Sequence, residues 1–423
     1  MTNSEPTADA RPSPAGAPPP PHPDAVPLYG PRYRENPAEL TRELRRTHGP
    51  VVPVLLEGDV FAWLVIGYRE LHQLLSDPQL FARDSRIWNQ WPNIPPDWPL
   101  MAFIAYQPSV LFGEGPDHQR RVDAVSDALG GVDQFELRAR CEEIADALID
   151  GFAGSGEAEL MTQYVRSIPV MTIAGIMGIS TSEIEGVAQD AIAALDGGEG
   201  SQEAYGRVAA AMQRLMAAKR AEPGADVTSR MLAHPAALTD EELAQDLLLV
   251  AIGGQEATAF WIGNTLHLML TDDRFSLTLS GGRQSVGQAL NEVLWENVPL
   301  QNSLGRWATR DTQLGGRHIQ AGDGLILGLA GANADPYVRG ASPGGPPANN
   351  AHLSFAHGSH GCPHPAPEIA EVIARTAVEV LLDRIPDVIL AVPAEELVWR
   401  PSFQMRGLLS LPVKFSPVPA TRS

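Results

Sequence analysis

Cys362 is the residue whose type and surroundings point most directly to chemistry, because it ends the glycine- and histidine-rich segment 353–362. A cysteine thiolate that binds a haem iron needs a loop that presents the sulfur to the metal and N–H donors that spread its charge. Gly358 permits the positive φ with which the chain can turn beneath such a ligand. A helix that starts near Pro363 would direct its positive end at the sulfur and lower the pKa of the thiol. The segment therefore predicts a haem-thiolate site.

Two other interpretations stay open on these residues alone. Cys362 would be an ordinary buried cysteine in a polar loop, or it would bind zinc together with the neighbouring histidines (His357, His360 and His364). One cysteine with such closely packed histidines has no recognised zinc spacing. The second cysteine, Cys141, lies within a predicted helix and is expected to be structural.

Adjacent glycines interrupt the longest predicted helix, which covers residues 241–270 and is apolar on most sides. Glycine costs about 1 kcal/mol relative to alanine inside a helix, so Gly253 and Gly254 call for a physical reason. The close approach of a flat ligand to the backbone is one reason, and a kink in a core helix is the alternative.

The spacing Phe355-x-x-Gly358-x-His360-x-Cys362 resembles the haem-binding signature of the cytochromes P450. The long helix is similar to the oxygen-binding helix of that family. Further partial matches follow in the family's order from Leu28 to Val413. The resemblance implies a mainly α fold, the cytochrome P450 fold, built as a single domain with small β sheets.

The same resemblance assigns roles to individual residues. Cys362 is implied as the axial ligand of haem b, and His360 as a hydrogen-bond donor to a haem propionate. On the long helix, Gly253 and Gly254 are implied to lie against the porphyrin, and Glu256 to relay protons to bound oxygen.

The position after this acid carries an alcohol in the family, whereas here it is Ala257. Thr258 is one residue further on and turned by about 100° around the helix. Glu256 and Thr258 are the catalytic candidates, although Thr258 does not simply take the usual place.

Arginine and histidine residues elsewhere resemble the family's propionate ligands. Arg306 matches a strand arginine that clamps one propionate, a task that suits its forked donors. His118 fits the first position of an H-x-x-x-R element whose arginine position is Val122 here. Arg121, one residue earlier, is expected to reach the same face. Taken separately, His118 and Arg121 are more typical of surface residues.

Several family positions carry other residues. Ala356 and His364 stand where glycines are usual, and Trp295 stands where the arginine of the E-x-x-R helix would pair with Glu292. The loop 339–347 also lacks the usual partner arginine. We therefore expect an atypical member in which indole packing replaces a salt bridge.

Residues 1–27 are rich in Pro, Ala and Ser and are predicted to be a disordered leader, followed by the haem domain at 28–423. A hairpin is predicted over 51–66, with short strands near 306–308, 324–329, 397–399 and 408–413. Apolar residues at helical spacing predict the helices (38–46, 68–75, 117–129, 134–152, 159–177, 182–195, 202–221, 241–270 and 365–384). Segment 86–110 is expected to be a loop over the haem, whose aromatic residues would face a bulky apolar substrate or form a packed lid (Trp88, Trp91, Trp98, Met101 and Phe103).

The chain has 423 residues with 31 basic and 51 acidic side chains, a formal charge of −20. Such a charge repels phosphate backbones and anionic lipids, so nucleic acid and membranes are not expected partners. Two cysteines form no disulfide framework, and the first residues contain no apolar signal or anchor, so we expect a cytoplasmic protein.

The leading functional hypothesis is a monooxygenase that hydroxylates a small organic substrate with O2 and electrons from a ferredoxin and a ferredoxin reductase. Ala257 and Trp295 motivate an alternative, a haem-binding sensor, ligand carrier or peroxide-dependent enzyme with weak or lost oxygen activation. A haem-free all-α interaction protein is the third hypothesis.

Overall fold

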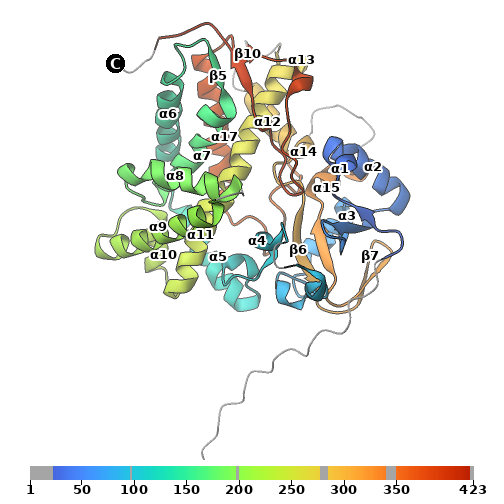
Figure 1. Cartoon of the computed structure of the whole chain (residues 1–423). Coiled ribbons are helices and arrows are strands. Elements are labelled where there is room, and N and C mark those ends of the chain that lie inside the picture. Colours follow the sequence, from blue (N-terminus) through green and yellow to red (C-terminus); the bar gives the residue numbers. More distant parts are fainter. Residues whose placement is uncertain (1–21, 96–97, 197–199, 277–283, 340–348, 420–423) are drawn as a thin grey trace, which may run out of the picture.

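The computed structural model describes residues 22–419 except for four internal segments, 96–97, 197–199, 277–283 and 340–348. Helices gather on one side of the molecule and a twisted sheet with short helices lies on the other (Figure 1). Among the described residues, the helical side contains α5 (Gly115–Gly130), α6 (Gln134–Asp150), α7 (Ser167–Ile176), α8 (Thr181–Asp196), α9 (Ser201–Ala221), α10 (Val227–Ala233), α11 (Asp240–Gly253), α12 (Gln255–Thr271), α14 (Gln284–Glu296) and α17 (Ala366–Arg384).

The larger sheet has six described strands in the order β1-β2-β3-β9-β6-β4. These strands are β1 (Val26–Pro27), β2 (Val51–Leu56), β3 (Val60–Val65), β9 (Gly324–Leu327), β6 (Ser303–Ala308) and β4 (Phe81–Ala82). Short helices accompany them: α1 (Pro31–Glu35), α2 (Pro37–His48), α3 (Tyr68–Ser76), α4 (Met101–Ile104), α15 (Leu329–Asn333) and α16 (Pro336–Arg339). Two smaller sheets contain β10 (Ile389–Leu390), β11 (Pro412–Lys414) and β5 (Glu157–Glu159), and β7 (Thr312–Leu314) and β8 (Arg317–Ile319). This mainly α architecture with small sheets confirms the predicted fold class.

The hairpin predicted over 51–66 is present as β2 and β3, with Val54 opposite Ala62. Gly58 and Asp59 both have positive φ at the turn, 79° and 58°. This is the backbone twist that a tight hairpin requires, and glycine and aspartate adopt it at low cost.

Helix α12 runs through the middle of the helical side and packs against α7, α14 and α17. Ala259, Ile262 and Leu266 are almost fully buried in the main core. A helix that is apolar on all sides is stable only when protein surrounds it. The central position of α12 therefore follows from its sequence.

Some predicted boundaries differ from the structure. The single helix expected over 241–270 is two helices, α11 and α12, which meet at a turn at Gly254. The strand expected at 397–399 is reduced to an isolated bridge between Trp399 and Leu408.

Most of the predicted leader, residues 1–21, lies outside the described residues. Val26 and Pro27 pair with Val54 and Leu55 of β2, so regular structure begins before the predicted boundary at residue 28. None of the helices in the described part of the chain is long and apolar enough to cross a membrane.

Candidate functional site

The loop that carries Cys362 is a tight turn held by its own backbone. The N–H of Cys362 donates to the carbonyl oxygen of Phe355 at 2.9 Å, and the N–H of Gly361 donates to that of Gly358 at 3.0 Å. Gly358 has φ 75°, as expected, and a Cβ at this position would collide with the backbone carbonyl of Leu75. Glycine is therefore required at 358 both for its conformation and for the space beneath it.

The thiol of Cys362 lies in a low-polarity environment. The residue is accessible, yet the surrounding protein desolvates the sulfur and raises the pKa of the thiol to about 12, with Glu368 adding to the rise. The prediction that the following helix lowers this pKa is wrong, because burial of the sulfur raises it. A metal cation bound to sulfur would favour the thiolate strongly, so this position suits a metal-bound cysteine better than a free reactive thiol.

Two buried arginines lie beside this loop. Arg306 of β6 is 2% exposed, donates from Nη1 to the carbonyl of Gly305 at 2.8 Å, and has no hydrogen-bond partner for Nε. Burial lowers the pKa of Arg306 well below its usual value, and the nearby charge of Arg83 lowers it further. Arg83 donates to Gly305 and Leu111, and burial lowers its pKa to about 10.

Glu114 is the acid that the structure places against this group of cations. Its Oε2 lies 3.7 Å from Nε2 of His360, and its Oε1 accepts the backbone N–H of Arg83. One carboxylate beside two buried guanidinium groups leaves an excess of positive charge, which is costly away from water. The two carboxylates of a haem would match this excess. The donor set therefore fits an anionic cofactor beside Cys362.

His118 and His360 stack within the same cluster, with ring centroids 3.9 Å apart. Nδ1 of His118 lies 2.9 Å from the carbonyl oxygen of Val110, and Nε2 lies 2.9 Å from that of Ser359. His118 thus bridges the loop before α5 and the Cys362 loop. Burial lowers the pKa of His360 to about 4, and its Nδ1 has no partner.

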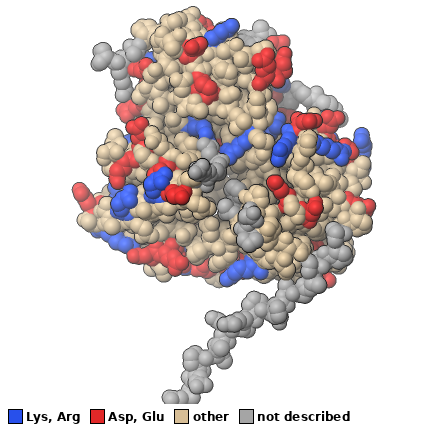
Figure 2. Space-filling view, in the orientation of Figure 1, with Lys and Arg blue, Asp and Glu red and all other residues tan. Residues whose placement is uncertain are grey.

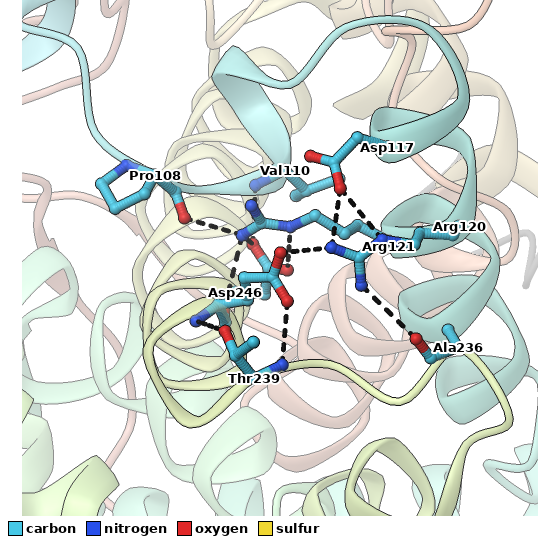
Figure 3. A network of polar contacts seen from close by, with 9 residues as sticks. Pro108, Val110, Asp117, Arg120, Arg121, Ala236, Thr239 and Asp246 are labelled. Carbon is cyan, nitrogen blue, oxygen red and sulfur yellow. Dashed lines mark hydrogen bonds and ion pairs between the residues drawn. The ribbon is translucent and has the colours of Figure 1, made fainter. Parts of the chain in front are cut away.

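Arg121, predicted to bind the cofactor, forms a buried ion pair with Asp246 of α11. Its Nε and Nη2 donate to the two carboxylate oxygens of Asp246 on α11 at 2.8 and 2.6 Å, and both side chains are buried (Figure 3). Nη2 also donates to the carbonyl of Pro108, and Asp246 accepts the N–H of Val110. Arg121 therefore ties the loop before α5 to α11, and the neighbouring Arg120 pairs with Asp117 and Glu242.

Gly253 and Gly254 are exposed although their helices run through the middle of the fold. The hydroxyl of Thr258 donates to the carbonyl of Gly254 at 2.6 Å, so its proton is used within the helix. Glu256, on the first turn of α12, forms an ion pair with Arg400 and lies 3.9 Å from Arg166.

Phe355 packs edge-on against Trp261 of α12 with ring centroids 5.9 Å apart, which joins the Cys362 loop to the central helix. Trp88 and Trp98 of segment 86–110 are buried in the sheet-side core, so they pack as core residues of the fold. The side chain of Phe103 lies outside the described residues.

Sequence reasoning missed Arg83, Glu114, Arg166 and Arg400. Arg83 lies 31 residues from Glu114 along the chain, and Arg400 lies 144 residues from Glu256. No short sequence spacing links residues so far apart. The buried positions of Arg83 and Arg306 can be identified only when the sheet is known.

Known proteins resemble this chain along most of its length. No family model matches the chain. Biflaviolin synthase CYP158A1 of Streptomyces coelicolor is 30% identical over 414 residues, covering 94% of this chain and 97% of the relative. Cytochrome P450 monooxygenase PikC of Streptomyces venezuelae is 30% identical over 389 residues, covering 88% and 89%. The solved structure of CYP154C4 from Streptomyces sp. ATCC 11861 matches with a TM-score of 0.82 at 27% identity, covering 93% of this chain and 98% of that one.

Proposed function

This chain belongs to the cytochrome P450 family, and from that premise we propose that Cys362 is the thiolate ligand of its haem b. The chain is an oxidoreductase of the monooxygenase class. The observation that supports the ligand assignment is the position of Cys362. This residue ends a tight glycine turn beside a buried excess of cations. A group with two carboxylates would balance these cations, and its central metal would bind the sulfur.

Arg306 and His360 would hold the haem propionates, and His118 would join them by releasing the carbonyl of Val110 or Ser359. Gly253 and Gly254, which have no side chains, would let the central helix lie against the porphyrin, while Phe355 and Gly358 shape the turn beneath it. When bound, a haem with thiolate ligation supplies the redox chemistry that favours O–O cleavage. The substrate is a small organic molecule that is hydroxylated, and the haem domain is assigned to residues 28–423.

Glu256 is the proposed proton relay, and its surroundings define how it would work. The carboxylate is held by Arg400, Ala257 offers no hydroxyl, and the Thr258 hydroxyl is engaged with Gly254. A proton that leaves Glu256 must therefore travel through water or through a substrate hydroxyl. Glu256→Gln should lower the fraction of electrons that end in product, measured as product formed per NADPH consumed with a ferredoxin and its reductase. Unchanged coupling would remove this role.

Electrons are proposed to come from a separate ferredoxin and ferredoxin reductase in the cytoplasm.

The decisive experiment is the absorption spectrum of the reduced protein with CO. A strongly red-shifted Soret band, lost in Cys362→Ser but kept in Cys141→Ser, is expected for an anionic thiolate on the iron. A Cys362→Ser protein with the wild-type band would overturn the assignment.

Ala257 favours a second candidate function, a haem protein with weak oxygen activation that acts as a sensor, ligand carrier or peroxide-dependent enzyme. Steady NADPH consumption that yields peroxide and no product across substrate panels would support this candidate. Coupled hydroxylation would exclude it.

A further inference from the structure

Glu292 on α14 pairs with a cation on another helix, whereas the E-x-x-R motif places that cation three residues further along α14 itself. Its Oε1 lies 2.5 Å from Nη2 of Arg274, which belongs to the short helix α13 (Asp273–Ser276). The side chain of Glu292 is only 9% exposed, whereas that of Arg274 is 45% exposed and also bonds Asp272. The buried acid is therefore already neutralised from α13.

Trp295, three residues further along α14, bonds to the segment that leads to Cys362. Its indole N–H donates to the carbonyl oxygen of Asn349 at 3.1 Å, and the residue is 2% exposed. Its ring also packs edge-on against His352, with centroids 5.9 Å apart and an interplanar angle of 87°. Trp295 thus touches two residues of this segment, one by a hydrogen bond and one by ring packing.

Contacts continue from this point to the cysteine. The ring of His352 lies 5.9 Å from that of Phe355, and the carbonyl of Phe355 accepts the N–H of Cys362 at 2.9 Å. A continuous set of contacts therefore joins Trp295 to the backbone of Cys362.

A second set of bonds holds the middle of the same segment. Asn333 accepts the N–H of Leu353 at 2.8 Å and donates to Ser354, while the Ser354 hydroxyl donates to the carbonyl of Leu294 at 2.5 Å. Leu294 precedes Trp295 on α14, so the end of this helix is the support on which the segment rests.

We propose that Trp295 is a positioning residue for Cys362, and that Arg274 has taken over the charge-pairing of Glu292 that an arginine at position 295 would otherwise provide. The inference rests on the proposed role of Cys362 as haem ligand. The indole combines one N–H donor with a large apolar ring, and it carries no charge that a buried acid would have to balance.

These contacts make an arginine unfavourable at position 295. An arginine at position 295 would enter a buried site whose acid is already paired with Arg274. Burial of a cation without its own counter-ion is strongly disfavoured. Trp295→Arg should therefore reduce haem retention instead of strengthening the anchor.

The central test compares Trp295→Phe with a matched control, Trp98→Phe. Trp98 is equally buried at 3% and donates its indole N–H to the carbonyl of Glu57, but it packs in the sheet-side core. Both substitutions remove one N–H from a buried ring. Trp295→Phe should lower the share of the reduced CO complex with the red-shifted thiolate band and speed haem transfer to apomyoglobin, by about tenfold for one lost hydrogen bond. Trp98→Phe should change neither.

Equal thiolate fractions and equal haem transfer rates in the two variants would overturn the positioning role, and so would tighter haem binding in Trp295→Arg. A wild-type protein that shows no thiolate band would instead overturn the proposed function of Cys362. A haem-free readout keeps the two apart, because amide exchange across residues 349–354 of the apoprotein should accelerate in Trp295→Phe and not in Trp98→Phe.

The exchange of charge partner has its own test. Glu292→Gln and Arg274→Gln should each accelerate the same amide exchange, and the double variant should be no worse than either single one, as expected for two residues that act as one pair. Asp272→Asn, which removes the other carboxylate bonded to Arg274, is the control and should have little effect. Additive effects of Glu292→Gln and Arg274→Gln would contradict the pairing.

Discussion

At the scale of single residues, the site is defined by charges that the chain does not balance by itself. Arg306 is buried with an unpartnered Nε, and Glu114 is the acid that faces it and Arg83. An uncompensated buried cation destabilises the protein alone and favours any anion that reaches it. Arg306 is therefore expected to destabilise the apoprotein and to strengthen retention of an anionic cofactor.

Arg306→Met tests this directly. Removing the buried charge while keeping the chain length should leave the apoprotein equally stable or more stable by about 1–2 kcal/mol, while haem dissociates faster. Urea unfolding of the apoprotein and haem transfer to apomyoglobin measure the two effects. Loss of apoprotein stability together with unchanged haem retention would show that Arg306 is structural.

His352 gives a pH-dependent prediction. Burial lowers its pKa from 6.5 to about 4, so the unfolded chain binds a proton at a higher pH than the folded chain does. Stability therefore decreases as the pH falls from 6.5 towards 4, by up to about 3 kcal/mol. His352→Phe, which keeps a ring beside Trp295, should flatten the pH dependence of urea unfolding in this range.

At the scale of secondary-structure elements, buried polar bonds join parts of the chain that lie far apart in sequence. The Arg121–Asp246 pair connects α5 with α11, and it also fixes Pro108 and Val110 of the loop before α5 (Figure 3). His118 then bonds Val110 and Ser359, so the same loop is tied to the Cys362 loop. These bonds determine where the loop lies relative to α11 and to the Cys362 loop.

Arg121→Met should be strongly destabilising, in contrast to Arg306→Met. It leaves the buried carboxylate of Asp246 without its cation, which costs about 3–5 kcal/mol for a buried pair. Urea unfolding of the apoprotein measures the loss, and amide exchange should rise around residues 108–112. The double variant Arg121→Met/Asp246→Leu should recover much of the stability. A single variant as stable as Arg306→Met would contradict the pairing.

At the scale of the whole molecule, an acidic chain encloses a positively charged interior site. The formal charge is −20, and acidic side chains are scattered over the visible face with basic ones between them (Figure 2). The cation cluster lies inside, where water and salt screen it least. We therefore expect cofactor binding and global stability to be linked.

Added haem should stabilise the apoprotein by about 2.7 kcal/mol when the free haem concentration is 100 times Kd. The thermal unfolding midpoint should therefore rise with the logarithm of the haem concentration. Metal-free protoporphyrin has the same carboxylates but no iron, so it should give a smaller rise. In Cys362→Ser the two ligands should give equal rises. A wild-type protein that responds equally to both would indicate that the sulfur contributes nothing.

The sequence by itself determined the features that depend on short segments. The hairpin at Gly58, the turn at Gly358 and the central position of the apolar helix follow from backbone conformation and from apolar spacing, which neighbouring residues specify. The identification of Cys362 as the candidate ligand belongs to the same group, because the residues that shape its turn lie within a few positions of it.

Only the tertiary structure decided which charges meet. Arg121 was expected to reach the face of His118 from its place three residues later, and the fold pairs it with Asp246, 125 residues away. Glu292 pairs with Arg274, and Glu256 with Arg400. A charged side chain takes the partner that packing brings within reach in a dry environment, where an unpaired charge is most costly. Packing of distant elements leaves no local pattern in the sequence, so these pairings appear only in the folded chain.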